Sequence, residues 1–392
     1  MARVEAPKGT SATLPHLSHV EGLRALAALT VFVNHAYAQV WEGPANRGDP
    51  SAVLAPLSYS LVAGHLAVTV FIVVSGFCLT LPVARGNDRL RGGAAEFFKR
   101  RAVRILPPYY AAIGLSLALI WTVIGQPTGT LWDVPIRVSP TTIAAHVFLV
   151  QDLYGTGSIN YVLWSIAVEW QIYMLFPLLL LCWRRLGPAT TVILALVAGY
   201  ALRMGCDGTR VARMNSHFLG MFALGMFAAY VATSKHERYL RLRKSKLWGW
   251  AAAAAFVATL VMVRYMDTVG WRFGFITIDL VVGVMAMTVL VQSSREEGGA
   301  LKRALSWRPL VFVGSFSYSL YLIHAPLLQL MWQYGVNPAG FGSDATFLIL
   351  MTAGLLLVLA ASYGFYRAFE APAMRAASRI RSDKVPAPAL TT

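Results

Sequence analysis

Ionisable side chains stand inside long apolar stretches of this sequence, where they are unfavourable and therefore candidates for chemistry. Arg24 and His35 lie eleven residues apart in the first such stretch. Eleven helical steps of about 100° place both side chains on one face of a helix, about 16 Å apart along its axis. A neutral imidazole at that depth can accept a proton in catalysis. The alternatives are an arginine that anchors the helix at the membrane surface and a histidine that only packs between helices.

A second polar stripe starts at Ser165 and recurs every four residues through Glu169, Tyr173 and Pro177. This spacing predicts one polar face on an otherwise apolar helix. Glu169 lies about 12 Å along that helix from Tyr161, which is near the expected depth of His35. The alternative is a structural glutamate that is hydrogen-bonded to a serine or a tyrosine.

A third stripe combines Gly314, Ser317, Tyr321 and His324 at spacings of three and four residues. Glycine and serine in this pattern allow two helices to approach closely, which is the structural interpretation for the first two positions. His324 lies about 22 Å along the helix from its expected start. This places it level with His35 and Glu169, so the three stripes predict one shared polar centre.

A basic cluster precedes the third apolar stretch and contains Lys99, Arg100, Arg101 and Arg104. Such a cluster can serve membrane topology and contact with anionic lipid. The functional alternative is a phosphate clamp, because arginine forks bind phosphate through two hydrogen bonds.

The elements that must position these residues are membrane-spanning helices. Only 13% of the 392 residues are charged and 57% are apolar, whereas a soluble domain has about 25% charged residues. This excludes an ordinary soluble enzyme and predicts an all-α, polytopic membrane protein with about ten transmembrane helices. The expected spans are residues 20–41, 61–83, 107–125, 161–183, 189–206, 215–234, 247–266, 274–292, 309–332 and 344–368. The run 141–150 is shorter and is expected to be re-entrant or interfacial.

Positive charge alternates from loop to loop and accounts for much of the net charge of +16. The positive-inside rule then places both termini in the cytoplasm and the protein in the cell membrane as a multi-pass protein. The charge is therefore a topology signal, and no nucleic-acid partner is expected. Residues 1–38 also resemble a secretory signal, but a retained first span agrees better with the later loops. We expect a polar head over 1–19, a transmembrane domain over 20–370 and a basic, disordered tail over 371–392.

Cys78 and Cys182 lie within apolar runs and are interpreted as small apolar residues. Together with Cys206 they are too few and too scattered for a disulfide framework. No metal site is expected either, because the short motifs of metalloenzymes are absent.

The polar blocks resemble those of the membrane-bound acyltransferase family 3, in the family's order and over about residues 18–370. The blocks are Glu21 to Arg24 with His35; Ser75, Gly76 and Phe77 with Arg100, Arg101, Arg104 and Pro107; Trp164 and Ser165 with Glu169 and Tyr173; and Ser317 and Tyr318 with Tyr321 and His324. Each block is weak alone, and four in order are strong. Glu21 and Trp170 depart from the family pattern, which more often has Asp at the first position and a second acidic residue at the other.

The resemblance implies transfer of an acyl group, acetyl or another short chain, from cytoplasmic acyl-CoA to a hydroxyl. The acceptor would be a carbohydrate, a glycopolymer or a natural product such as a macrolide. Acyl-CoA is a substrate, and no permanently bound cofactor is expected. No second catalytic domain follows the last span, so we expect the membrane core itself to acylate the acceptor.

The residues suit this reaction. We expect His35 to act as the general base and Glu169 to orient it or to stabilise its imidazolium. The expected CoA-binding residues are Arg24, Arg100, Arg101 and Arg104, and the expected substrate-binding residues are Ser75, Trp164, Ser165, Tyr173, Ser317, Tyr318, Tyr321 and His324. Direct attack without an acyl-enzyme is favoured, because no Cys or Ser has an evident base partner. The alternative from another class is a proton-coupled transporter, since His, Glu and Arg within spans also serve proton relays. A purely structural role ranks third.

Overall fold

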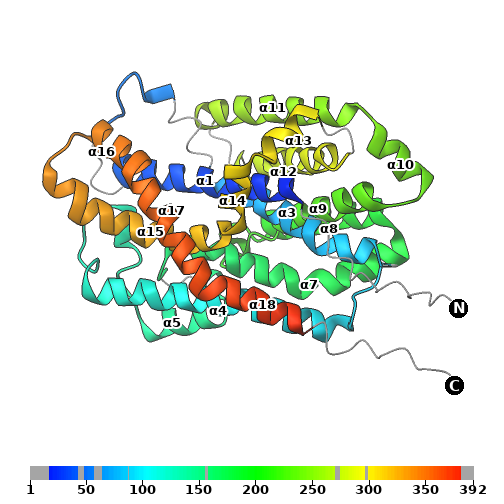
Figure 1. Cartoon of the computed structure of the whole chain (residues 1–392), viewed down its shortest axis with the longest axis horizontal. Coiled ribbons are helices and arrows are strands. Elements are labelled where there is room, and N and C mark those ends of the chain that lie inside the picture. The colour runs from blue at the N-terminus through cyan, green and yellow to red at the C-terminus, as the bar shows by residue number, and fades with distance from the viewer. Residues whose placement is uncertain are drawn as a thin grey trace, which may run out of the picture.

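The computed structural model describes residues 17–42, 48–56, 64–86, 88–154, 158–269, 274–295 and 299–380 of the chain. Every regular element within these ranges is a helix, which confirms the all-α prediction. The long helices are α1 (Ser18–Trp41), α3 (Gly64–Ala84), α4 (Gly93–Thr122), α7 (Trp164–Leu186), α8 (Pro188–Gly205), α9 (Phe218–Thr233), α11 (Leu247–Val269), α12 (Gly274–Ser293), α15 (Ser317–Met331) and α17 (Leu355–Phe365). Several of the long helices, such as α1, α4, α7 and α11, lie roughly along the horizontal axis of Figure 1, whereas α17 runs diagonally across them.

Shorter helices connect and extend them. These are α5 (Pro140–Val147), α6 (Gln151–Tyr154), α10 (Glu237–Lys244), α13 (Gly299–Leu305), α14 (Arg308–Ser315), α16 (Ser343–Ile349) and α18 (Ala371–Arg379), the 3₁₀ turns η1 (Leu131–Asp133), η2 (Tyr161–Leu163), η3 (Val211–Met214) and η5 (Asn337–Ala339), and the π-helical segments η4 (Trp332–Val336), η6 (Leu350–Gly354) and η7 (Tyr366–Glu370).

The described residues form eight helices that are long and apolar enough to cross a membrane. A ninth span results if α14 and the segment Ser317–Ala339, which meet at a bend of 73°, count as one. The chain is therefore a multi-pass membrane protein, as predicted. Helix α1 corresponds to the first of the ten predicted spans and has 24 residues, but it is not among these candidates. It is less apolar than they are because it carries Arg24, Asn34, His35 and Gln39. It packs against α3, α14 and α15, so much of it faces protein.

Two predicted spans differ from the structure. Helix α4 begins at Gly93 rather than at residue 107, and it continues through Pro107 and Pro108. Arg100, Arg101 and Arg104 therefore lie on a helix and not in the loop before it. The ninth span is not straight, because Phe316 leaves the helical conformation with φ −124° and ψ 21° between α14 and α15. The expected interfacial run contains the short helix α5, which is not among the candidate spans.

Close backbone contacts hold the central helices together. A Cβ atom added at Gly76 of α3 would lie 2.1 Å from the carbonyl oxygen of Phe222 in α9. One added at Gly314 of α14 would lie 2.0 Å from the carbonyl oxygen of Glu21 in α1. Both distances are far below van der Waals contact, so only glycine allows these pairs to approach so closely. The helix-packing interpretation of Gly314 is thus confirmed, and Gly76 has the same role.

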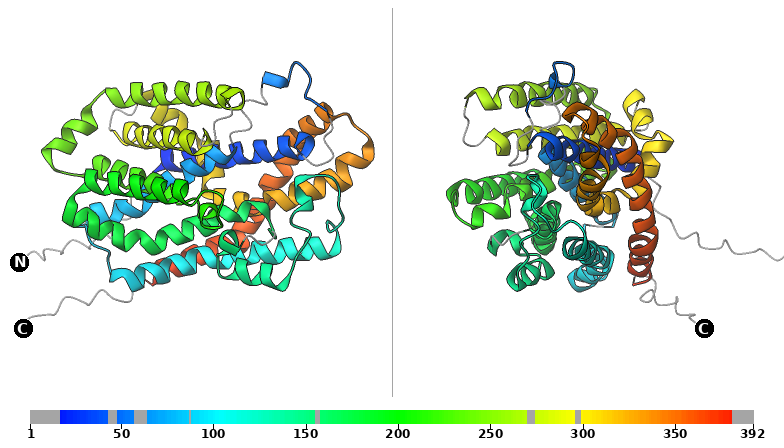
Figure 2. Two further views of the ribbon diagram at one scale, coloured as in Figure 1. Left: turned by 180° about the vertical axis from the view of Figure 1, so that it is seen from behind. Right: turned by 90° about the vertical axis from the view of Figure 1, so that its left-hand side faces the viewer.

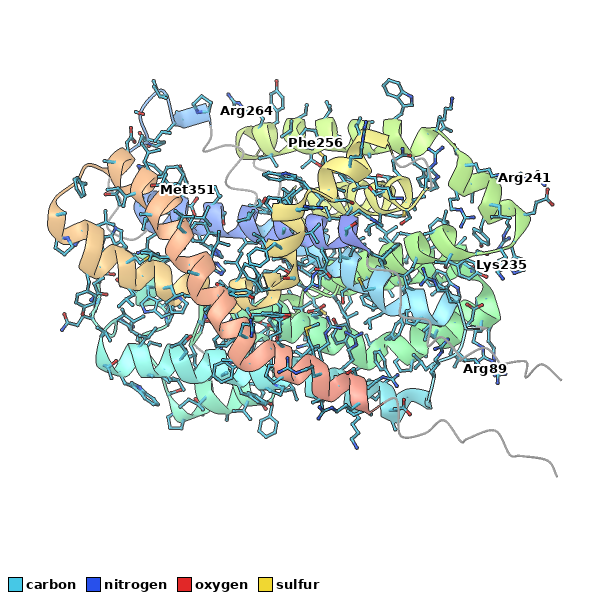
Figure 3. The ribbon with its side chains drawn as sticks, viewed as in Figure 1. Arg89, Lys235, Arg241, Phe256, Arg264 and Met351 are labelled. Atoms are coloured by element: carbon cyan, nitrogen blue, oxygen red, sulfur yellow. The ribbon has the colours of Figure 1, made fainter. Side chains whose placement is uncertain are left out.

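The two ends of the bundle differ in character. Helix α1 begins and α18 ends toward one end, on the right in Figure 1, and α16 lies at the other. Arg89, Lys235 and Arg241 lie at the first end, and Met351 lies toward the second (Figure 3). We call these the basic end and the opposite end. Across the bundle, α11 and α12 lie at one edge and α4 with α5 at the other (Figure 2). The predicted tail begins with α18, which packs on α4, and residues 381–392 and 1–16 lie outside the described residues.

Candidate active site

A cavity of about 430 Å³ opens between the basic ends of α1, α3 and α4 and reaches the middle of the bundle. Ten residues expected at the site line it together: Arg24, Ser75, Arg101, Arg104, Ser165, Glu169, Tyr173, Ser317, Tyr318 and Tyr321. They come from α1, α3, α4, α7 and α15, so the four sequence blocks meet here. We call this space the donor cavity.

Arginines surround the basic half of the donor cavity. Arg101 and Arg104 are three residues apart on α4 and share its inner face, and Arg85 lines the cavity near its mouth. The guanidinium of Arg24 lies 3.3 Å from the carboxylate of Glu21. The other carboxylates that line the cavity are Glu169 and Glu370. Arg100 was expected to join this group, but its side chain pairs with Glu96 one turn earlier in the helix and does not line the cavity.

Tyr173 organises the wall between the arginines and the middle of the bundle. Its hydroxyl donates to the carboxylate of Glu169 on the same helix, and the hydroxyl of Ser75 on α3 lies 2.7 Å from it. Because the tyrosine proton is directed to Glu169, Ser75 is the donor in the second hydrogen bond. The guanidinium of Arg101 lies 5.7 Å from the centre of the Tyr173 ring, within cation–π range. Three of the predicted residues thus form one network with Arg101.

The inner end of the donor cavity is formed by Ser165 and Tyr321. The Tyr321 hydroxyl donates to the carbonyl oxygen of Val162 at 2.9 Å, and the Ser165 hydroxyl lies 2.7 Å from the same tyrosine oxygen. Nearby, the buried hydroxyl of Ser317 has no hydrogen-bond partner among the described residues. A bound thioester would therefore meet at least one hydroxyl that is free to donate.

His35 pairs with His324. Nδ1 of His35 and Nε2 of His324 are 2.7 Å apart, and the two rings are nearly parallel, at 11°. Nδ1 of His324 faces the carbonyl oxygens of Tyr321 and Leu320 at 2.8 and 3.1 Å. Carbonyls only accept, so this nitrogen carries the proton, and Nε2 of neutral His324 accepts from His35. Nε2 of His35 is then unprotonated and can act as a base.

The expected pairing of His35 with Glu169 is wrong. The two residues were placed at matching depth, but Glu169 accepts from Tyr173 within its own helix, and it lines the donor cavity. Neither histidine lines that cavity. Tyr321 connects the cavity with the histidine pair. Its side chain lines the cavity, and the centre of its ring lies 5.9 Å from that of the His324 ring. Matching depth along a helix does not fix the direction in which a side chain points, which explains the error.

Trp164 lies apart from the donor cavity. It lines a second space, a polar hollow of about 500 Å³ at the opposite end of the bundle. Its ring is stacked on His65 of α3, with ring centres 5.4 Å apart and an angle of 8°. Trp164 and Ser165 are consecutive, so the two spaces approach each other at the start of α7.

Sequence reasoning missed a buried carboxylate on α12. Asp279 is fully buried, and one of its oxygens lies 3.2 Å from Nε2 of His65 and 3.0 Å from Nε2 of His217. Thr69 donates to its other oxygen. The signal was present, since Asp279 is an ionisable residue inside a predicted span. No group of three metal-binding side chains suited to an ion is found among the described residues.

Two cavity residues were also missed. Glu370 of η7 lines the donor cavity and accepts hydrogen bonds from the hydroxyl and the backbone N–H of Ser319 at 2.5 and 3.1 Å. Glu370 lies just after the last predicted span, so it was not considered among the ionisable residues inside spans. Cys78 was interpreted only as a small apolar residue, and the structure shows that it is exposed and lines the donor cavity.

The helical bundle defines an integral-membrane protein with an arginine-lined cavity that opens at its basic end. A family model described as an acyltransferase domain matches residues 18–367. The chain therefore belongs to the acyltransferase 3 family. The predicted resemblance is confirmed.

Three curated relatives indicate the range of the family. The chain is 24% identical over 346 residues to the O-acetyltransferase OatA of Staphylococcus aureus, covering 82% of this chain and 52% of that protein. It is 27% identical over 341 residues to the putative peptidoglycan O-acetyltransferase YrhL of Bacillus subtilis, covering 80% and 49%. It is 26% identical over 350 residues to Nodulation protein 10 of Rhizobium leguminosarum, covering 83% and 89%. The chain thus spans about half the length of the first two relatives. No solved structure matches it.

Proposed function

We propose that the protein transfers an acetyl or other short acyl group from acyl-CoA, which enters the donor cavity from the basic end, to a hydroxyl of an acceptor. The observation that carries this proposal is that Arg24, Arg101 and Arg104 line one cavity whose inner end is formed by Ser165 and Tyr321. The phosphates of CoA cannot enter hydrocarbon without a large penalty, so they need such groups at the bundle's surface.

The spacing of Arg24 and His35 along α1 suits the arm of CoA. Arg24 and His35 are separated by about 16 Å along α1. A pantetheine arm held by its phosphates near Arg24 would bring its thioester to the level of Tyr321 and the histidine pair. The cavity is lined by apolar side chains such as Val68 and Ile72 at that depth, which favours the arm over water.

The proposed chemistry is direct attack. The acceptor hydroxyl gives its proton to Nε2 of His35 as its oxygen bonds to the thioester carbon. The carbon–sulfur bond breaks, and the CoA sulfur takes the proton back from His35. His324 accepts from Nδ1 of His35 throughout and holds the ring in the required tautomer. His324 is thus a positioning residue rather than the substrate-binding residue that was expected.

The hydrogen-bond networks support this step. Ser317 and Ser165 are the hydroxyls nearest the inner end of the cavity, and we propose that Ser317 donates to the thioester oxygen. Glu169 fixes Tyr173, which in turn lies under the guanidinium of Arg101. Glu169 therefore positions the donor-binding wall instead of orienting His35.

We also propose that the basic end faces the cytoplasm, where acyl-CoA is available. The loops with excess positive charge lie at this end, as Arg89, Lys235 and Arg241 illustrate (Figure 3), and such loops are retained on the cytoplasmic side. Both termini would then be cytoplasmic. The relatives named as O-acetyltransferases support acetyl as the acyl group and a peptidoglycan-like carbohydrate as one acceptor class. Membership of an acyltransferase family removes the support for the proton-coupled transporter.

Cys78 offers a direct test because it lines the donor cavity. In a Cys182→Ala/Cys206→Ser variant it is the only thiol in the chain. A membrane-impermeant maleimide should label it, and desulfo-CoA, which has no thiol to react, should protect it. S-acetylpantetheine lacks the nucleotide phosphates and should protect poorly. Equal protection by both compounds, or by neither, would contradict an arginine clamp for CoA. Labelling from inside-out but not right-side-out vesicles would support the proposed orientation.

A further inference from the structure

The polar hollow at the opposite end is lined by residues that the donor cavity does not use. They are Asp152, Trp164, Arg203, Asp207, Gly208, Thr209, Ala212, Arg213 and Asn215, and the hollow measures about 500 Å³. It lies where α7 begins and α8 ends, whereas the donor cavity opens where α1 begins and α3 ends. The two spaces therefore open at opposite ends of the bundle.

Two side chains around the hollow have polar atoms that form no hydrogen bond within the described part of the chain. Among the described residues, Oδ2 of Asp152 and Nε of Arg203 are buried and have no partner. Buried polar atoms are nearly always hydrogen-bonded, so each such atom needs an explanation such as a ligand. Burial also raises the pKa of the Asp152 carboxyl to about 7, against the opposing effect of Arg213. Its proton can therefore be retained near neutral pH, which lets the group donate as well as accept.

Few charges of the hollow are uncompensated. Arg203 is paired with Asp207 at 3.1 Å, and Arg213 faces Asp152, whose carboxyl is only partly ionised near neutral pH. A single arginine with partial compensation favours a polar neutral ligand over a highly charged anion. Planar carboxylate, guanidinium and amide groups each form paired hydrogen bonds, which suits neighbouring hydroxyls on one molecule.

Trp164 supplies the apolar surface of the hollow, and its position is fixed. Its ring is stacked on His65, whose Nε2 is bonded to the fully buried Asp279. His217 and Thr69 hold the same carboxylate. The buried carboxylate, which has no place in the donor site, thus positions the tryptophan that faces the hollow.

The hollow lies close to the reacting centre. Trp164 lines the hollow, and Ser165, the next residue, lines the inner end of the donor cavity, so their Cα atoms are about 3.8 Å apart. Three residues earlier, the ring of Tyr161 lies 5.0 Å from that of His35. Residues 161–165 thus contact the general base, the donor cavity and the hollow.

We propose that the hollow is the acceptor site and that it binds a neutral polyhydroxylated molecule, a saccharide, from the end opposite the one at which acyl-CoA enters. This inference rests on the proposed acyl transfer. It adds where the acceptor binds and which residues form that site. Trp164 packs against the C–H face of a sugar ring, and Asp152, Arg203 and Arg213 bond its hydroxyls. The acceptor hydroxyl then reaches the thioester past the start of α7.

The test uses the purified full-length protein in nanodiscs, where both ends are accessible. The probes are cellotetraose, maltotetraose and chitotetraose, and binding is measured by calorimetric titration. At least one probe should bind the wild type, and Trp164→Ala and Arg213→Gln should weaken that binding about tenfold or more. Trp250→Ala is the matched control, because Trp250 is an exposed tryptophan of α11 outside both spaces, and it should bind as the wild type does.

Two further measurements separate the possible outcomes. Protection of Cys78 by desulfo-CoA is measured for every variant and should persist in all of them. Trp164→Phe keeps an aromatic ring and should retain part of the binding, which separates loss of a contact from failure to fold. The proposal is overturned if none of the three saccharides binds or if the hollow variants bind as tightly as the wild type. If saccharides bind as expected but CoA does not protect the wild type, the hollow remains a saccharide site and the proposed donor site fails.

Discussion

Nδ1 of His35 donates across 2.7 Å to Nε2 of His324, which is itself held by two backbone carbonyls of α15. A chain of hydrogen bonds therefore fixes the tautomer of His35 without a carboxylate. In many enzymes an Asp or Glu performs this task and also stabilises the imidazolium that forms. Here the carbonyl dipoles and a second imidazole replace it.

The first prediction concerns the base. His35→Ala should lower kcat by about 10²–10⁴, the usual contribution of a general base, without changing membrane insertion. Transfer of radiolabelled acetyl from acetyl-CoA to the acceptor measures the effect. A folded variant that keeps activity within threefold of the wild type would remove His35 from the mechanism.

His324 should matter through His35. His324→Ala should lower kcat with little change in the KM for acyl-CoA, because His324 does not line the donor cavity. His324→Gln should recover part of the loss, since its amide oxygen can still accept from His35. In the His35→Ala background, His324→Ala should have almost no further effect. Additive losses would mean that the two histidines act independently.

The arginines of α4 provide a comparison within one helix. Arg101→Lys and Arg104→Lys should raise the KM for acyl-CoA severalfold, because an ammonium cannot reproduce the planar fork of a guanidinium. Arg100→Lys is the matched control, since Arg100 pairs with Glu96 outside the cavity, and its KM should not change. Steady-state kinetics at varied acyl-CoA concentration measure all three. Similar KM values for the three variants would mean that the cluster serves only membrane topology and contact with lipid.

Gly76 should be intolerant of any side chain. Gly76→Ala places a Cβ atom 2.1 Å from the Phe222 carbonyl oxygen, and such overpacking costs about 1–3 kcal/mol. Gly114→Ala on α4 is the control, because a Cβ atom there meets nothing within 4 Å and alanine favours a helix. Thermal unfolding in detergent should show a lower apparent Tm for the first variant only. An unchanged Tm for Gly76→Ala would mean that α3 and α9 can move apart freely.

Asp152 should make stability depend on pH. Burial raises its pKa from 3.8 to about 7, so between these values the folded state binds more protons than the unfolded state does. The wild type therefore loses stability as pH rises through this window, and the loss is complete above about pH 7. Asp152→Asn removes this penalty. Its apparent Tm should exceed that of the wild type by roughly a few degrees at pH 8 and by clearly less at pH 5. A difference that does not depend on pH would refute the burial of an ionised Asp152.

The helical spans were predictable because a single requirement governs them. A segment that crosses a membrane must be apolar over about 20 residues, whatever its neighbours are. The predictions failed where contacts with neighbouring helices determine where a helix begins or breaks. Pro107 and Pro108 were expected to stand at the start of a helix, yet α4 continues through them. The ninth predicted span is broken at Phe316, directly after Gly314 and Ser315, where α14 packs closely on α1.

The site was predictable residue by residue but not pair by pair. Helical periodicity placed Ser165, Glu169 and Tyr173 on one face, and all three line the donor cavity. The rotation of one helix about its axis relative to another is set by packing, and periodicity contains no information about it. Glu169 was therefore assigned to His35, although His324 was available at the same depth. The network around Asp279 was missed for a simpler reason, because the prediction rested on the ionisable residues of three other spans and gave no role to His65, His217 and Asp279.

Helix α1 carries both Arg24 and His35, and it is too polar to count among the candidate spans. It packs against α3, which begins at Gly64, and against α14 and α15, which begin only at Arg308 and Ser317. The contacts of this segment with α14 and α15 can therefore form only after the helices between them have been synthesised. Because His324 of α15 is the hydrogen-bond partner of His35, we expect from the proposed mechanism that a chain shortened before α15 is inactive even where its helices are inserted.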